Sequence, residues 1–416
     1  MARESALRAF KHRNYRILFP ASVLSNIGTW AQRIAQDWLV LELTNSAQIL
    51  GLITALQFLP SLLLSLYGGV LADRFDKRTL LMITNIGAGL GSLSLGLLVV
   101  SGAVEIWHVA VLAFTVGVFS AIDAPVRTSF NSELVGHQDI PSAISLNSAN
   151  FNAGRLIGPA ASGFLIVLFG TGVSFLINSL TYVAVVIALA LMRKDLLFIS
   201  VKPNSAAKLK QAVQYVIGQR DIFLVMLAVF FATTFGLNFQ IFMAVMATQE
   251  FGKGPAEFGI LGSVLAVGSF TGVLISARFE HLRVPKFVMF GGMLFGLLLT
   301  ITAWMPSYGT FAMMLPLVGG MALMTLISAN SFVQTNCEPT LRGRVMGIYL
   351  LIFMGGTPIG SPLIGWFAEV VGIRWTVMGC GLIVLIASIA IYIALRRSKT
   401  ADPITESMPV IPEPRS

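Results

Sequence analysis

Residues 68–81 read GGVLADRFDKRTLL, a stretch whose five charged side chains separate two long apolar segments at 48–72 and 79–101. Each of these segments exceeds the roughly 20 residues that a helix needs to cross a bilayer. The stretch is therefore expected to form a tight corner at a membrane surface. Carboxylates and cations at such a corner can make charge-assisted bonds to a neighbouring helix bundle and break them when that bundle moves.

The composition of the whole chain agrees with a membrane protein. Of 416 residues, 56% are hydrophobic and only 11% are charged, and the mean hydropathy is +0.81. Soluble domains carry about 25% charged residues, so a soluble fold with a polar surface is excluded. Two cysteines are too few for a disulfide framework.

Twelve segments are long and apolar enough to be membrane spans. They are 17–43, 48–72, 79–101, 106–128, 140–168, 172–192, 221–248, 256–278, 286–303, 309–335, 343–369 and 374–395. We therefore expect an all-α integral membrane protein with twelve transmembrane helices in two pseudo-symmetric six-helix bundles.

The spans divide the chain into five parts. These are a cytoplasmic N-terminal segment 1–16, an N-terminal bundle 17–192, a cytoplasmic linker 193–220, a C-terminal bundle 221–395 and a disordered cytoplasmic tail 396–416. Apolar residues of the linker share one helical stripe that includes Leu209, Val213 and Ile217. The stripe indicates an amphipathic helix on the membrane surface, with an ordinary solvated helix as the alternative.

Basic residues fix the expected orientation. All but four of the 28 Lys and Arg residues fall in the two tails or in the connections that an N-inside topology places in the cytoplasm; the four are Arg33, Arg155, Lys253 and Arg374. Cytoplasmic loops of membrane proteins carry this excess. Both termini are thus expected to be cytoplasmic. The net charge of +9 is explained by topology and by contact with anionic lipid, without a nucleic-acid partner.

The two halves repeat each other. A shift of 202 residues places Val116–Gly117 on Val318–Gly319, and it places Gly154 and Gly158 on Gly356 and Gly360. Parallel duplication of this kind is typical of transporters that rock two bundles about a central site. The repeated glycines allow helices to pack closely.

The opening stretch resembles the loop between helices 2 and 3 of the major facilitator superfamily, G-x-L-a-D-r-x-G-r-k. Asp76 stands where that pattern has its second glycine. The resemblance implies a cytoplasmic gate that latches the two bundles, in which Asp123 would pair with Arg74 or Arg78; a local Asp123–Arg127 helix pair and a merely basic loop are the alternatives. The expected gate residues are Gly69, Asp73, Arg74, Asp76, Lys77, Arg78, Asp123 and Arg127.

A second motif, NAGRLIGPAASG at 152–163, resembles the antiporter signature of the same superfamily. Gly154, Gly158, Pro159 and Gly163 fit it. Stretches 38–60, 123–135 and 338–349 are similar to macrolide-efflux and enterobactin-type siderophore exporters. These resemblances imply export against a proton, although Ala113 stands where many such antiporters have an arginine in helix 4.

Charged residues inside the bilayer are costly and indicate function. Arg33, Asp37 and Arg155 are expected to form one cluster facing the cavity, as a proton-coupling site, a substrate contact or a structural ion pair. Neutral polar residues extend this expected proton-coupling or substrate site, with ordinary helix packing as the alternative. They are Gln32, Gln36, Asn147, Asn150, Asn178, Asn238, Gln240, Asn330 and Gln334, and the aromatic Phe151 lies among them.

No motif indicates catalysis. The sequence contains no nucleotide-binding loop, and its four histidines lack metal-ligand spacing. We expect a non-enzymatic, monomeric secondary transporter in a bacterial cytoplasmic membrane that exports amphiphilic drugs or metabolites by alternating access. Its expected partners are a small-molecule substrate and the bilayer. Its expected energy source is a proton gradient, and no cofactor, ATP or metal is expected. The alternatives are a siderophore or lysophospholipid transporter that recognises an anionic group, and a non-transporting receptor.

Overall fold

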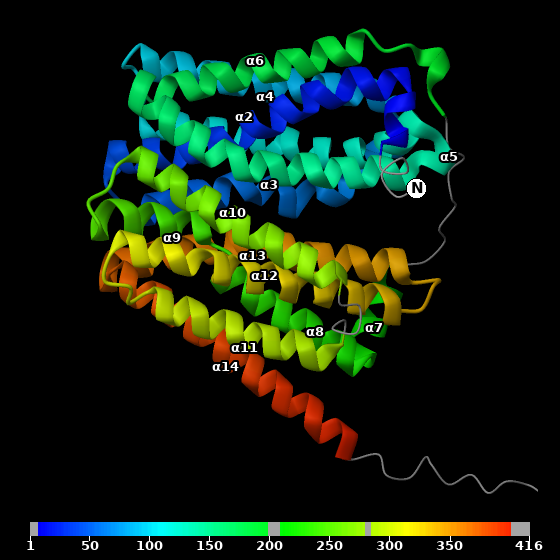
Figure 1. Ribbon diagram of the computed structural model, residues 1–416. Coiled ribbons are helices and arrows are strands. Elements are labelled where there is room, and N and C mark those ends of the chain that lie inside the picture. Colours follow the sequence, from blue (N-terminus) through cyan, green and yellow to red (C-terminus); the bar gives the residue numbers. More distant parts are fainter. Residues whose placement is uncertain (1–6, 199–208, 279–283, 401–416) are drawn as a thin grey trace, which may run out of the picture.

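The computed structural model describes residues 7–198, 209–278 and 284–400, and all regular elements within these ranges are helices (Figure 1). The predicted tail beyond residue 400, the start of the linker helix and the surroundings of Gly69 lie outside the described part.

The first half of the chain forms four long α-helices and a fifth of double length. The elements are η1 (Arg8–Lys11), α2 (Arg13–Thr44), α3 (Ala47–Arg74), α4 (Lys77–Val100), α5 (Ile106–Phe169), α6 (Thr171–Ala190) and the short η2 (Lys194–Leu196). In α5, Gly136 has φ 68° and ψ 170°, a backbone conformation that glycine adopts without strain, so two successive spans meet at this residue.

The second half contains the same number of spans. The elements are α7 (Leu209–Gly218), α8 (Arg220–Phe231), the π-helix η3 (Ala232–Gly236), α9 (Phe239–Val245), the π-helix η4 (Met246–Glu250), α10 (Pro255–Arg278), α11 (Pro285–Thr302), α12 (Tyr308–Asn336), α13 (Arg342–Val371) and α14 (Ile373–Thr400). Elements α8 to η4 form one interrupted span.

The prediction of twelve transmembrane helices is confirmed. Ten helical segments within the described ranges meet length and hydropathy criteria for a span. Helix α5 supplies two spans rather than one, and the polar helix α2 falls short of the hydropathy criterion. Three boundaries differ clearly from the prediction. The first helix begins at Arg13 rather than residue 17, and the fourth span continues past residue 128 to the break at Gly136. The last helix continues past residue 395 to Thr400, so the start of the predicted disordered tail 396–416 is helical.

The two halves lie side by side with their long helices running in similar directions (Figure 1). The first described residues and the last turns of α14 lie at the same end of the bundles, which we call the termini end; the opposite end is the far end. Helices α3 and α5 of the first half pack against α13 and α10 of the second. In α7, Ala212 and Val216 are buried, whereas Val213 and Ile217 stay exposed.

The repeated glycines occupy equivalent contacts in the two halves. A β-carbon built on Gly117 of α5 would lie 2.4 Å from the Gln57 carbonyl oxygen of α3, and one built on Gly319 of α12 would lie 2.8 Å from the Leu265 carbonyl oxygen of α10. Any larger residue would push these backbones apart. The sequence repeat therefore corresponds to a repeated helix-packing contact.

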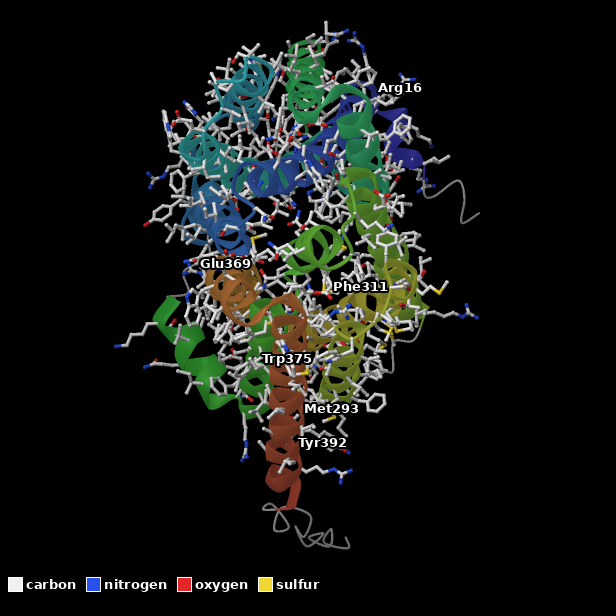
Figure 2. All side chains as sticks on the ribbon, turned by 90° about the vertical axis from the view of Figure 1, so that its left-hand side faces the viewer. Arg16, Met293, Phe311, Glu369, Trp375 and Tyr392 are labelled. Carbon is white, nitrogen blue, oxygen red and sulfur yellow. The ribbon has the colours of Figure 1, made fainter. Side chains whose placement is uncertain are left out.

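The halves are joined most closely at the far end. A β-carbon on Gly51 of α3 would lie 2.3 Å from the Ser361 carbonyl oxygen of α13, and one on Gly259 of α10 would lie 2.4 Å from the Pro159 carbonyl oxygen of α5. Glu369 on α13 lies at this boundary when the molecule is viewed from the far end (Figure 2). Its carboxylate accepts hydrogen bonds from the first turn of α3.

Candidate functional site

A cavity of about 430 Å³ lies between the two halves. Helices of the first half supply most of its wall, and Leu237, Phe353, Met354 and Thr357 supply the side that belongs to the second half. The wall combines aromatic side chains with charged and amide groups. A polar and apolar lining of this kind is typical of sites for small amphiphilic molecules.

Arg33 of α2 lines this cavity and lies over two aromatic rings. Its guanidinium carbon is 4.7 Å from the Trp30 ring centre and 5.3 Å from the Phe58 ring centre. Arg155 of α5 approaches the same Trp30 ring at 5.8 Å, and Phe151 meets that ring edge-on at 5.7 Å. Aromatic faces attract cations, and more so away from water. Trp30 therefore holds two arginines near the cavity.

The antiporter-type motif places Trp30 by close packing. A β-carbon on Gly158 would lie 2.5 Å from the Trp30 β-carbon, and one on Gly154 would lie 3.0 Å from the Asn26 backbone carbon. The other two motif residues face the second half: a β-carbon on Gly163 would lie 2.6 Å from the Pro255 carbonyl oxygen, and Pro159 packs against α10. The motif is thus the contact surface of α5 with both α2 and α10.

Asp37 lies one helical turn beyond Arg33 but does not line the cavity. Its side chain is 3% exposed, and its Oδ2 atom has no hydrogen-bond partner in the described part of the chain. The neighbouring Gln36 has an unpartnered Nε2 atom as well. Among the described residues no ion pair joins Asp37 to Arg33 or Arg155. The expected cluster therefore consists of two arginines around Trp30 and a separate, enclosed carboxyl group.

The expected pairing of Asp123 with Arg74 or Arg78 is wrong. Asp123 Oδ2 accepts a hydrogen bond of 2.7 Å from Arg127 Nε, which was the alternative. Its Oδ1 atom accepts hydrogen bonds of 2.9 Å from Thr84 Oγ1 and from Asn85 Nδ2 of α4. These bonds hold the carboxylate within the first half.

Asp123 and Arg127 also lie deeper than a gate residue would. Both line the central cavity. The first span of α5 continues to the break at Gly136, so Asp123 stands about 18 Å along the helix from Val135. The span had been expected to end at residue 128, and this shorter boundary placed both residues too near the surface. They are part of the cavity wall.

The charged corner that follows α3 makes its described contacts within the first half. Lys77 forms an ion pair with Glu133 of α5, and Arg78 donates to the carbonyl oxygens of Leu189 and Ala190 at the end of α6, at 2.7 and 2.8 Å. Side chains of Asp73 and Arg74 are exposed. The corner therefore braces α4 against α5 and α6.

Asp76 caps the N-terminus of α4. Its Oδ1 atom accepts hydrogen bonds of 2.7 Å from the Thr79 backbone N–H and from Thr79 Oγ1. Partial burial raises the pKa of Asp76, but these hydrogen bonds and the charges of Lys194 and Arg78 outweigh it, so the pKa lies below its ordinary value. This explains an aspartate where the superfamily pattern has glycine, because aspartate is a preferred capping residue.

The neutral polar residues fall into three groups. Asn147 and Asn150 line the cavity, and Asn150 Oδ1 has no partner in the described part. A second group is engaged between helices: Gln32 Oε1 accepts hydrogen bonds of 2.6 Å from both Ser92 and Asn178, and Asn238 Oδ1 accepts one of 3.0 Å from Ser361. Outside the cavity wall lie the half-buried Gln240 and Asn330 and the exposed Gln334.

Several contacts of polar residues were not expected from the sequence. Thr84 and Asn85 bond the Asp123 carboxylate, Glu133 pairs with Lys77, and Glu369 binds the start of α3. The adjacent polar pair Thr84–Asn85 within an apolar span was the available signal. No group of three potential metal ligands occurs in the described part of the chain.

Comparisons with known proteins agree with this architecture. The family model described as "Transmembrane secretion effector" matches residues 4–415. The chain is 27% identical to the Staphyloferrin A transporter of Staphylococcus aureus over 92% of its length and 96% of the relative's. It is 24% identical to the multidrug efflux pump Tap of Mycolicibacterium fortuitum, with 91% and 94% covered. It is 21% identical to the enterobactin exporter EntS of Salmonella choleraesuis, with 95% and 96% covered.

Solved structures share the fold at low sequence identity. An inward-facing, occupied bacterial homolog of the human lysosomal transporter Spinster superposes with a TM-score of 0.73 at 16% identity, covering 95% of this chain and 99% of the other. The nucleoside transporter NupG superposes equally well, with a TM-score of 0.73 at 12% identity and coverage of 92% and 99%. At these identities the likeness concerns the fold alone.

Proposed function

The chain belongs to the transmembrane secretion effector family of the major facilitator superfamily, and on this premise we propose that it exports amphiphilic molecules bearing an anionic group. It works by alternating access, as a monomer in a bacterial cytoplasmic membrane with both termini in the cytoplasm. Its substrates are metabolites or drugs, with a siderophore or a lysophospholipid as examples of the anionic class.

Arg33 carries this proposal. The cavity wall contains three charged side chains, and two of them, Asp123 and Arg127, neutralise each other. Arg33 has no ion pair within the described residues, so its positive charge is left for a ligand. Charge-assisted hydrogen bonds to a guanidinium favour carboxylate and phosphate groups. The rings of Trp30 and Phe58 beside it suit the apolar body of an amphiphile.

The joined far end supports alternating access. If the termini are cytoplasmic, the far end faces the outer side of the membrane. The close contacts there then close the cavity to that side. Substrate then enters from the cytoplasm. Release outward requires the contacts of α3 with α13 and of α5 with α10 to separate while the termini end closes.

Asp37 is the proposed proton site. A proton on the unpartnered Oδ2 atom would neutralise a carboxylate whose charge is costly when buried. Loss of that proton would restore the negative charge one helical turn from Arg33. By charge alone an ionised Asp37 weakens the attraction of Arg33 for an anion, so exchange requires the conformational change itself to keep protonated Asp37 and bound substrate from crossing the membrane together. The proton gradient is the energy source, and no cofactor or ATP takes part.

Exchange of Arg33 tests the substrate class. Arg33→Gln should lower transport of an amphiphilic acid roughly 10- to 100-fold, the value of a hydrogen bond to a charged group, and leave its neutral amide analogue unchanged. Arg33→Lys should retain part of the activity. Arg342→Gln, which removes an exposed cation outside the cavity, is the matched control. Equal loss for acid and amide in Arg33→Gln would reject the anionic class.

An uncharged or cationic drug is the second candidate substrate. The aromatic side chains Trp30, Phe58, Phe119, Phe151 and Phe353 give the cavity an apolar area that tolerates varied shapes. The similarity to the pump Tap favours this candidate. Under it, the Arg33→Gln variant would transport acids and amides equally.

A further inference from the structure

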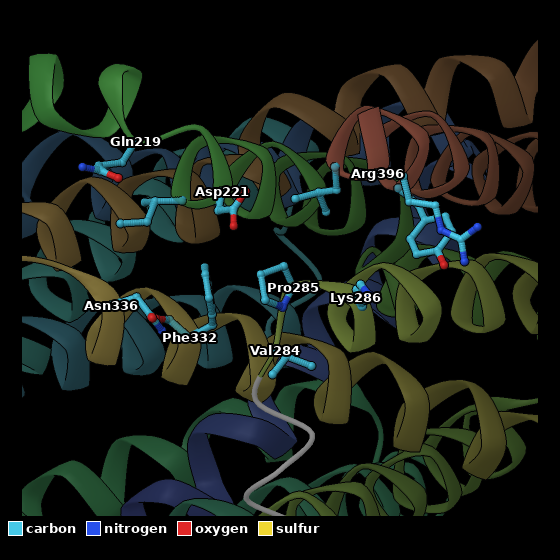
Figure 3. Close-up of a pocket in the computed structure, with 11 residues that line it drawn as sticks. Gln219, Asp221, Val284, Pro285, Lys286, Phe332, Asn336 and Arg396 are labelled. Atoms are coloured by element: carbon cyan, nitrogen blue, oxygen red, sulfur yellow. The ribbon is translucent and has the colours of Figure 1, made fainter. Parts of the chain in front are cut away.

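A second cavity of about 540 Å³ lies at the termini end of the second half, away from the central cavity. The starts of α8 and α11 and the ends of α12 and α14 surround it (Figure 3). Ile222, Phe332 and Leu395 form buried apolar parts of its wall. Gln219, Asp221, Lys286, Asn336 and Arg396 add polar and charged groups.

The first half shows how the equivalent space can be closed from within. There Asn14 of α2 bonds the backbone of Arg193 just after α6, at 2.8 and 3.1 Å. Arg78, the second residue of α4, donates to the last carbonyls of α6. The ends of α2, α4 and α6 are thereby tied together by the chain's own side chains.

The second half keeps only one of these two ties: Arg220 of α8 donates a hydrogen bond of 3.1 Å to the Ala394 carbonyl oxygen of α14, whereas the tie made by Arg78 has no counterpart in the described part. Lys286 is the second residue of α11, the position that Arg78 has in α4. Within the described residues its side chain makes no hydrogen bond or ion pair, and it faces the cavity, with Lys286 and Arg396 toward one end and Gln219 and Asn336 toward the other (Figure 3). The two halves differ at this position: the first half has a hydrogen bond between helices, and the second half has a cation that faces a cavity.

We propose that this cavity binds the headgroup of a phospholipid carrying a single phosphodiester charge, such as a glycerol headgroup. Lys286 faces the cavity without a partner in the described part of the chain, so one positive charge is available to meet the single charge of a phosphodiester. Membrane helices leave the hydrocarbon at these ends, and Ile222, Phe332 and Leu395 give the wall an apolar part that suits the glycerol end of the acyl chains. Basic pockets between membrane helices are suited to anionic headgroups.

Lipid binding to delipidated protein in detergent tests this site, with native mass spectrometry as the readout. The probes are phosphatidylglycerol and phosphatidylcholine with identical acyl chains. One Lys near a membrane surface contributes about 1 kcal/mol, so phosphatidylglycerol should bind at least about fivefold more tightly. Lys286→Gln should remove that preference and Lys286→Arg should keep it. Lys210→Gln, which removes an exposed cation of α7 at the same end, should also keep it.

Three results would overturn the proposal. Equal affinity for the two lipids would remove the role of charge, and an unchanged preference in Lys286→Gln would place the lipid elsewhere. Competition by glycerol 3-phosphate as effective as by the lipid would indicate a soluble anion instead. Because binding is measured without transport, failure here leaves the proposed export function unaffected.

Discussion

The Glu369 carboxylate at the end of α13 accepts a hydrogen bond of 3.0 Å from the backbone N–H of Ala47, the first residue of α3. The Ser46 hydroxyl and the Gln48 N–H donate to the same oxygen at 3.2 and 3.4 Å. An anion at a helix N-terminus is stabilised by the unpaired N–H groups and the helix dipole. One residue of the second half thus caps a helix of the first, and opening of the far end must break this cap.

Glu369→Ala should shift the protein toward the form that is open at the far end. Loss of an anion from a helix N-terminus costs about 0.3–1 kcal/mol, which corresponds to a roughly two- to fivefold change in the ratio of the two forms. The measurement is labelling of a single cysteine at Ser61, in the cavity wall, by a membrane-impermeant maleimide from the far end, in protein lacking Cys337 and Cys380.

Glu105→Ala is the matched control for this variant. Glu105 caps α5 and bonds Trp107, so its contacts stay within the first half. Its exchange should leave the labelling rate at Ser61→Cys unchanged. If Glu369→Ala labels no faster than this control, Glu369 does not hold the far end closed.

Gly51→Ala should also hinder closure of the far end. The added β-carbon would lie 2.3 Å from the Ser361 carbonyl oxygen, and a backbone atom cannot rotate aside as a side chain can. We expect faster labelling of the Ser61→Cys reporter and slower transport. Gly379→Ala is the control, because nothing lies within 4 Å of a β-carbon there. Wild-type labelling in Gly51→Ala would show that α3 and α13 need not pack this closely.

Asp123 and Arg127 should be energetically coupled. Arg127→Gln leaves the Asp123 carboxylate in the cavity wall without its cation, so Asp123→Asn in the same protein should recover part of the lost thermal stability. Residues in one ion-pair network typically couple by about 0.5–3 kcal/mol. Thermal unfolding of the wild type, both single variants and the double variant in detergent measures this coupling. Additive losses would mean that the ion pair contributes no stability.

The cap at Asp76 predicts a pH-dependent contribution to stability. Because the pKa of Asp76 lies below its ordinary value in the folded protein, the ionised cap stabilises the fold at neutral pH, and this contribution is lost as the pH falls through the folded-state pKa. Asp76→Ala should cost about 1 kcal/mol at pH 7. The difference in Tm between wild type and variant should shrink in acid, whereas a constant difference would exclude a role for the carboxylate charge.

The fold was predictable because its main determinants are local. Span length, the distribution of Lys and Arg, and the repeat at Gly117 and Gly319 each require only the sequence. The break at Gly136 was harder to predict, because a single backbone conformation ends the helix and the sequence on either side continues a helical pattern. That single boundary decided whether Asp123 was placed at the surface or in the cavity.

The partners of charged groups could not be predicted in the same way. Arg78 bonds carbonyl oxygens of α6, and backbone acceptors leave no mark in a sequence. Glu369 accepts from backbone N–H groups at the start of α3, and backbone donors leave no mark in a sequence either. Arg33 and Asp37 were expected to share one cluster facing the cavity. Arg33 lines the cavity whereas Asp37 is enclosed, and this separation depends on how the neighbouring helices pack.

Transport into everted membrane vesicles tests the central claim most directly. The substrate is an amphiphilic acid, and a pH gradient, acid inside, is imposed and then collapsed with a protonophore. Exchange of protons at Asp37 for an anionic substrate at Arg33 predicts accumulation that ends when the gradient is collapsed and is absent from Asp37→Asn vesicles containing equal amounts of protein. Accumulation that continues after collapse, or that persists in Asp37→Asn, would contradict it.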